Sequence, residues 1–352
     1  MDPLDLGARL AQLLATGRRV STYKLATLDA LVQHCLENPV ADDAPLSVPV
    51  RDLASRVVEA YWPQVRVFGE HGVLRQIQHT RPGAVSVIDL VTDLRRNSDR
   101  RGLSTPAQFR TEEPHQWTAT VRKIAITLAR QPLFRLQKTG GREPGVAFLY
   151  DDSWLSDDVG IGNLDAHDWS IELFPGVATA LARVSPMLQP VLQQWWVEDV
   201  QRHNSAELEI PDLHAFLFDA DRTAVARLAP GLREFQQNRC FYCGRTLTGA
   251  VHVDHVLPWS RVAIDGVRNL VLTDPRCNGD KAATLPVLDH VREVLARPEA
   301  DLVVISAPVR WPVETERVRG AARGLYRSTG AGSPLWRAPG LYDFHDGTAV
   351  PL

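Results

Sequence analysis

The sequence predicts an α+β protein in three parts: a mostly helical region over 1–230 with a small β-hairpin near 132–150, a ββα unit within 231–290, and a helical C-terminal extension over 291–352 that packs on the body. Two observations predict this class. Apolar residues recur at helical spacing along the N-terminal region, and two short β-type runs precede a helix between positions 251 and 281. At 352 residues the chain is long enough for two or three domains.

The helices of the N-terminal region follow from their apolar faces. Leu6, Leu10 and Leu13 share one face of the first helix, and a later helix is expected over 51–62. Pro186 and Pro190 predict a kink or break in a long helix. Further helices are expected at 83–96, 115–130, 176–204, 221–236, 290–298 and 314–328.

The segment 132–150 differs from its neighbours, because two β-prone runs flank a Gly-Gly pair. This pattern predicts the hairpin. The segment that follows, 151–170, is acidic and is expected to be a solvated loop, since it lacks any fixed ligand spacing.

The composition is ordinary for a globular protein, with 44% hydrophobic and 23% charged residues. The sequence has no run of eighteen apolar residues and no continuous apolar stretch near its first residue, so a cytoplasmic protein without a membrane partner is expected. The net charge of −3 does not indicate a nucleic-acid partner. The distribution of charge is more informative: 81–143 carries a net +6, and 151–230 a net −10. A duplex would be attracted to the first region and repelled by the second; the alternative is two solvated faces of unlike sign.

Three of the four cysteines lie close together in the sequence. Cys240 and Cys243 form a Cys-x2-Cys turn, and Cys277 follows. Thiolates at this spacing bind zinc, which usually takes four ligands. Asp274 is the first candidate for the fourth ligand and His252 a weaker one; the alternative is that the cysteines only pack together.

Asp254 and His255 lie on the first β-type run, HVDHVLP. Neighbouring residues on a strand face opposite sides, so a bulge or a strand end is needed for both to serve one site. A neutral imidazole accepts a proton from water near neutral pH, and a carboxylate is a hard ligand for Mg²⁺ or Mn²⁺.

The second β-type run begins after Asn269, and the helix after it carries Asn278 and Lys281. These two residues are three apart and therefore share a helix face. An amide oxygen can be a second ligand of the ion beside Asp254, and a lysine one turn later can reach a phosphate.

On these residues the segment resembles the HNH endonucleases of the ββα-metal type with a zinc knuckle. The naming positions are His255, Asn269 and Asn278, and the last is Asn where many relatives have His. The departure is Asp274, where many relatives carry a fourth cysteine. The resemblance implies that Asp254 and Asn278 hold one divalent ion. It also implies that His255 is the general base, that Asn269 holds the loop, and that the products carry 5′-phosphate and 3′-hydroxyl ends.

The expected function is therefore a metal-dependent DNA endonuclease with Mg²⁺ or Mn²⁺ at the catalytic site and structural Zn²⁺. By analogy it serves restriction or anti-phage defence, acting on double-stranded DNA as a homodimer or with a defence partner. One alternative is an RNase or toxin-like nonspecific nuclease; another is a catalytically silent, zinc-stabilised DNA-binding module. Candidate DNA contacts are basic residues that are equally expected as solvated surface: Arg95, Arg96, Arg100, Arg101, Arg135, Lys138 and Arg261.

Overall fold

The computed structural model describes residues 2–16, 20–77, 85–138, 146–204, 210–219 and 222–348. The chain divides into two compact units. Unit 1 comprises Met1–Cys35 and Val40–Asp219, and unit 2 comprises Leu36–Pro39 and Ala220–Leu352. The predicted α+β class is confirmed, with a helical N-terminal region ahead of a small β-containing part.

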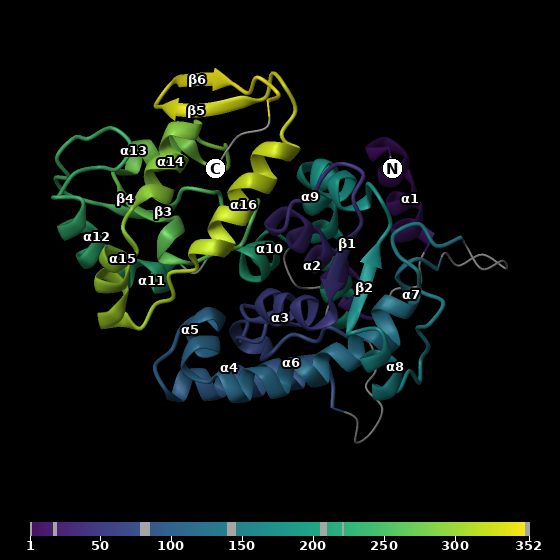
Figure 1. The fold of residues 1–352 in the computed structure, drawn as a ribbon. Coiled ribbons are helices and arrows are strands. Elements are labelled where there is room, and N and C mark those ends of the chain that lie inside the picture. Colours follow the sequence, from purple (N-terminus) through teal and green to yellow (C-terminus); the bar gives the residue numbers. More distant parts are fainter. Residues whose placement is uncertain are drawn as a thin grey trace. The chain divides into compact units, whose positions relative to one another are not determined.

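Unit 1 is built from helices and one two-stranded sheet, shown in Figure 1. Strands β1 (Leu46–Pro49) and β2 (Ser170–Leu173) pair antiparallel, with Leu46 opposite Leu173. The remaining elements are α1 (Pro3–Thr16), α2 (Tyr23–Glu37), α3 (Val50–Tyr61), α4 (Val87–Arg100), α5 (Pro106–Glu112), α6 (Pro114–Leu128), α7 (Phe134–Leu136), α8 (Ile161–Ala166), α9 (Val177–Asn204), α10 (Ile210–Phe218), the 3-10 turn η1 (Gly69–His71) and the π turn η2 (Ala129–Leu133).

Local sequence sets several helix starts. Ser86 caps α4 and Thr105 caps α5, each in a reciprocal capping box with the residue three positions later. Helix α4 continues to Arg100, so the basic run that begins at Arg95 is helical as far as Arg100. Helices α3, α4 and α6 contact one another and lie together in Figure 1.

The prediction of a hairpin near 132–150 is wrong for the described residues of that segment. The chain leaves α6 through η2 and α7, so residues 129–136 are helical, and the Gly-Gly pair at 140–141 lies outside the described residues. Leu133 and Leu136, three apart, are both fully buried, and this packing overrides their β propensity. Residues 146–149 form neither helix nor strand, and Gln137 accepts the backbone N–H groups of Phe148 and Leu149 at 2.8 and 2.6 Å.

A kink or break was predicted at Pro186 and Pro190; helix α9 continues through both prolines, so there is no break. A proline lacks an N–H, so Pro186 leaves the carbonyl of Ala182 without its usual helical donor. The Ser185 hydroxyl donates to that carbonyl at 2.8 Å and replaces the lost hydrogen bond.

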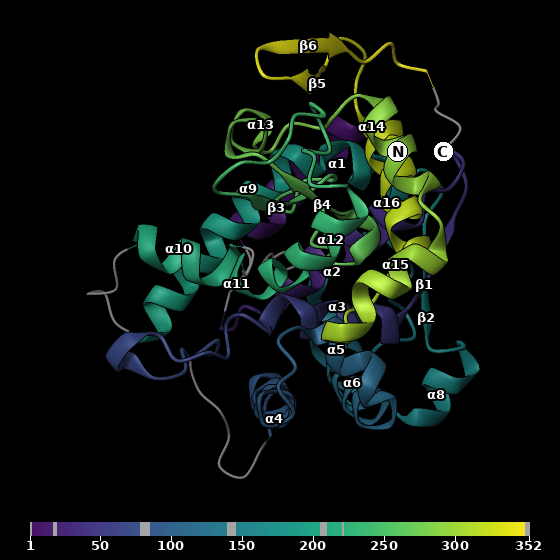
Figure 2. The ribbon, with the colours of Figure 1, turned by 90° about the vertical axis from the view of Figure 1, so that its left-hand side faces the viewer.

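Unit 2 contains two further two-stranded sheets, β3 (His252–His255) with β4 (Leu270–Thr273) and β5 (Pro334–Ala338) with β6 (Leu341–Phe344). Figure 2 shows β3 and β4 side by side. The helical elements are α11 (Arg222–Val225), α12 (Ala229–Phe235), α13 (Pro275–Lys281), α14 (Leu288–Ala296), α15 (Glu299–Ser306), α16 (Thr315–Ser328) and the 3-10 turns η3 (Ala226–Leu228), η4 (Val267–Asn269) and η5 (Ala307–Val309). No helix among the described residues is long and apolar enough to cross a membrane.

Candidate active site and metal centre

Helix α13 packs against strand β3 and brings two pairs of side chains together. Asn278 Nδ2 lies 2.9 Å from His252 Nδ1, and Lys281 Nζ lies 3.0 Å from Asp254 Oδ2. His252 and Asp254 are two apart on the strand and therefore share a face, while Asn278 and Lys281 share a face of the helix. The carboxylate of Asp254 and the amide of Asn278 therefore belong to the same strand–helix contact.

Asp254 is nearly buried, and two donors hold its carboxylate. The Tyr242 hydroxyl donates to Asp254 Oδ2 at 2.6 Å, and Lys281 forms the ion pair. Burial, and next the negative Asp254, raise the pKa of Tyr242 well above its ordinary value, so the phenol keeps its proton and remains a donor.

Lys281 is fully buried, and its ammonium also donates to the carbonyl of His255 at 2.8 Å. A buried ammonium needs a paired charge, and Asp254 supplies it. This position differs from the expectation that Lys281 reaches a phosphate: the side chain has no exposed surface and instead holds Asp254 and the end of β3.

The donor set at this contact suits a small hard cation. Asp254 offers a carboxylate, and Asn278, with its amide nitrogen turned to His252, offers a carbonyl oxygen. Mg²⁺ and Mn²⁺ prefer such oxygen ligands and fill the remaining positions with water and substrate oxygens. The residues therefore fit the catalytic ion that the sequence implies.

His255 is the last residue of β3, and its imidazole contacts the loop between the strands. Its Nε2 lies 2.8 Å from Asp265 Oδ1, and the ring of Trp259 lies 5.4 Å away, centroid to centroid. Asn269, fully buried, ties this loop: its amide accepts from the backbone N–H of Leu257 at 2.8 Å and donates to the carbonyls of Leu257 and Ile264, each at 3.1 Å.

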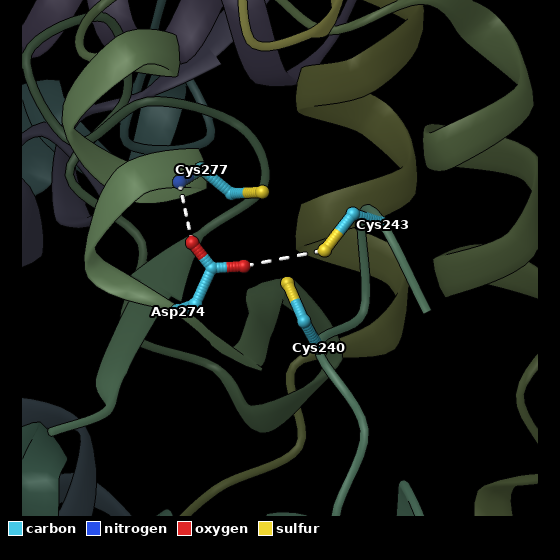
Figure 3. A group of neighbouring side chains, drawn as sticks. All are labelled: Cys240, Cys243, Asp274 and Cys277. Atoms are coloured by element: carbon cyan, nitrogen blue, oxygen red, sulfur yellow. Dashed lines mark hydrogen bonds between the residues drawn. The ribbon is translucent and has the colours of Figure 1, made fainter. Parts of the chain in front are cut away.

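A second cluster lies at the other end of β4. The ligand atoms of Cys240, Cys243, Asp274 and Cys277 all lie within 4.8 Å of one another, and Figure 3 shows them converging. His252, the weaker candidate for the fourth ligand, is not in this group. The cluster is compatible with a bound metal such as zinc, since three sulfurs and one carboxylate oxygen make a four-ligand set.

Local backbone structure positions the side chains of this cluster. Gly244, at φ +68°, allows the tight turn after Cys243. Asp274 caps α13 and accepts the backbone N–H of Cys277 at 2.9 Å and the Cys243 thiol at 3.2 Å (Figure 3). Burial works to raise the pKa of Asp274, but the hydrogen bonds from Cys277 and from the thiols outweigh it and lower that pKa. The carboxylate is therefore ionised and available as a ligand.

Comparison with known families places both units. The model of a domain of unknown function, DUF8808, matches residues 4–217, more than half of the chain. The chain belongs to the DUF8808 family. A second family model, HNH endonuclease, matches residues 240–287 and confirms the resemblance derived from the motifs. No curated protein and no solved structure matches the chain.

The HNH domain thus contains every residue singled out between 240 and 281. The structure brings Asp254, Asn278 and Lys281 to the contact between β3 and α13, and it brings Cys240, Cys243, Asp274 and Cys277 into one cluster. Asn269 lies in the loop after β3, and Arg261 belongs to neither group. Sequence reasoning missed two partners, Tyr242 and Asp265. Tyr242 stands inside the Cys-x2-Cys turn, where its spacing to Asp254 carries no pattern, and Asp265 lies in an irregular loop.

Six of the candidate DNA contacts lie in the DUF8808 domain, and they differ in exposure and in their partners. Arg95 is largely covered, with Nε 3.0 Å from Asp99 Oδ1 and its guanidinium over the Trp62 ring. Arg96, Arg100 and Arg101 are exposed. Arg135 pairs with Asp157 at 3.4 Å, and the Lys138 ammonium lies 3.2 Å from the centre of the Phe134 ring.

Arg261 belongs to the HNH domain and is less accessible than a surface arginine. Its burial lowers the pKa of the guanidinium below the ordinary value. Arg261 is thus half-buried, whereas Arg96 and Arg100 of α4 are exposed.

Proposed function

We propose that this protein is a metal-dependent DNA endonuclease whose HNH domain hydrolyses phosphodiester bonds. The observation that carries the proposal is the packing of α13 on β3, which pairs Lys281 with Asp254 and Asn278 with His252, and His255 follows Asp254 at the end of the strand. A binding module would need neither hard oxygen ligands nor a base at that place, which favours catalysis over the silent zinc-stabilised module.

Each side chain has a role in this proposal. Asp254 and Asn278 would hold Mg²⁺ or Mn²⁺, which when bound neutralises charge on the scissile phosphate. His255 accepts a proton from the attacking water, and the bond from phosphorus to the 3′ oxygen breaks. Lys281 and Tyr242 hold Asp254, and Asn269 holds the loop beside His255. One such site cuts one strand, so cutting both strands calls for a homodimer or a second encounter.

The cysteine cluster is proposed to hold structural Zn²⁺ with Asp274 as the fourth ligand. It joins the turn at Cys240 to the start of α13, and the same helix carries Asn278. Loss of zinc would therefore disturb the catalytic contact. Free thiols gathered at a metal site suit a reducing compartment, and the proposal includes a cytoplasmic location.

The proposed biological role is restriction or anti-phage defence, with the DUF8808 domain recognising DNA, a modification or a partner protein. Its support is a separate compact unit of helices with exposed Arg96, Arg100 and Arg101. A nonspecific RNase or toxin needs no domain of this size for recognition.

The test is cleavage of supercoiled plasmid, single-stranded DNA and RNA in Mg²⁺ and in Mn²⁺ by the parent, His255→Ala and the exposed control His115→Ala. We expect the parent and the control to nick plasmid DNA and His255→Ala to be inactive. Preference for RNA would replace the DNA assignment. Absence of cleavage together with absence of Mn²⁺ binding would support the silent module.

A further inference from the structure

The contact between His255 and Asp265 is more enclosed than a surface pair. The Nε2–Oδ1 distance is 2.8 Å, and the side chains are only 9% and 15% exposed. An ionised carboxylate accepts hydrogen bonds and cannot donate them. In the tautomer in which Asp265 is the acceptor, Nε2 carries the hydrogen and the lone pair of the neutral imidazole is on Nδ1.

The backbone of Asp265 is held by a segment from far along the chain, Trp311–Glu314, in the same unit. The Trp311 indole donates to the carbonyl of Asp265 at 2.6 Å. The backbone N–H groups of Val267 and Arg268 donate to the carbonyls of Pro312 and Val313 at 3.0 and 3.2 Å. The loop is thus held by this segment as well as by Asn269.

Gly266 shows how closely the two segments approach. A Cβ at this position would lie 2.6 Å from both the Val313 carbonyl oxygen and the Glu314 Cβ. Only a residue without a side chain fits, although the backbone here, at φ −55°, is one that any residue adopts. Gly266, next to Asp265, therefore permits the close approach of this segment.

We infer that Asp265 is a positioning residue for His255, and that Trp311–Glu314 holds Asp265 in place. The inference rests on the proposed function. When water attacks, its proton goes to Nδ1 of His255, and the hydrogen on Nε2 stays in the bond to Asp265. The imidazolium that forms lies beside a carboxylate, which stabilises it; Asp265 takes up no proton. The C-terminal extension thereby becomes part of the nuclease site.

Asp265→Asn keeps the shape of the side chain but removes the obligate acceptor. We expect kcat to fall by about 10²- to 10⁴-fold, with the KM for plasmid DNA and the Mn²⁺ affinity unchanged, because neither substrate nor ion touches Asp265. Trp311→Phe, which removes the indole N–H together with part of the buried ring, should lower kcat by a smaller factor. The matched control is Asp289→Asn, an exposed carboxylate of the same unit, and it should cut like the parent.

A second readout needs no cleavage. In ¹⁵N spectra of labelled histidine, the His255 signals are those missing from His255→Ala, and they should report hydrogen on Nε2 in the parent and a mixture of tautomers in Asp265→Asn. Hydrogen on Nδ1 in the parent would overturn the inference, as would full kcat in Asp265→Asn while His255→Ala is inactive. If His255→Ala cuts like the parent, the base assignment itself fails, and the inference falls with it for that separate reason.

Discussion

At the scale of single residues, the catalytic contact depends on buried charge. The buried Lys281 ammonium forms an ion pair with Asp254. The carboxylate that is proposed to bind a divalent cation is therefore already paired with one positive charge. A buried ion pair is costly to break, since removing one member leaves the other charge uncompensated. The pair therefore fixes the position of Asp254, and the divalent ion must use the oxygen surface that Lys281 and Tyr242 leave open.

Tyr242 gives a test of this arrangement. Tyr242→Phe removes the hydroxyl that donates to Asp254 Oδ2 at 2.6 Å and leaves the ring in place. Loss of a hydrogen bond that orients a metal ligand typically weakens metal affinity by about 10- to 100-fold. Titration with Mn²⁺, followed by the paramagnetic signal of the free ion, should show this loss. Tyr342→Phe, at an exposed position of β6, is the control, and equal affinity in the two variants would contradict the role.

At the scale of elements, helix α16 approaches a neighbouring backbone through two glycines. A Cβ at Gly324 would lie 1.8 Å from the carbonyl oxygen of Leu36, and one at Gly320 would lie 2.1 Å from that of Glu37. The Arg317 side chain, on the same helix, pairs with Glu37 at 2.8 Å. The segment Leu36–Pro39 is thus joined to unit 2 by close backbone packing.

Gly324→Ala should destabilise unit 2 by at least about 2 kcal/mol, because the added methyl cannot be accommodated without moving backbone. Gly330→Ala is the control, since nothing lies within 4 Å of its Cβ position. Thermal unfolding of both variants measures the difference. Equal melting temperatures would mean that α16 does not approach Leu36 as closely as described.

Helix α2 carries a carboxylate whose protonation is coupled to folding. Burial raises the pKa of Asp29 to about 6, against the opposing influence of Arg56. The folded state holds this proton more tightly than the unfolded chain, so stability is lost as pH rises from about 4 to about 6 and stays lower above that range. Asp29→Asn removes this cost.

We therefore expect Asp29→Asn to raise the melting temperature at pH 8 and to change it little at pH 4. The gain in the free energy of unfolding should be about 2 kcal/mol larger at pH 8 than at pH 4. Asp43→Asn, at an exposed position, is the control and should show no such difference. A gain of equal size at both pH values would point to a cause other than ionisation of Asp29.

Local signals predicted many elements well, because caps and helical spacing act within one turn. The helix expected over 51–62 corresponds to α3, and the helix expected over 115–130 corresponds to α6 and the first residues of η2. The segment 132–136 misled because its leucines are buried by distant packing. Motif spacing singled out Asp254 and Lys281 but did not predict their ion pair, because Lys281 was expected to reach a phosphate. Asp265 was missed because its partners, His255 and Trp311, lie ten and forty-six residues away.

At the scale of the whole molecule, the two units differ in whether they hold the cysteine cluster. The described part of each unit has helices and a two-stranded sheet or sheets around its own apolar core. Unit 2 in addition contains the cysteine cluster, which joins the turn at Cys240 to α13. Removal of metal should therefore act on one unit and spare the other.

We expect a zinc chelator to speed amide hydrogen exchange in peptides from β3, β4 and α13 while peptides from α3, α6 and α9 stay protected. The reason is that a structural metal contributes its binding energy to the fold that holds it. Added Zn²⁺ should restore protection and Mg²⁺ should not, which separates the two proposed sites. Asp274→Asn, which keeps a good helix cap but loses the carboxylate, should bind zinc more weakly than the control Asp289→Asn. Uniform exchange across both units would contradict separate stabilisation, and unchanged zinc affinity in Asp274→Asn would remove Asp274 from the ligand set.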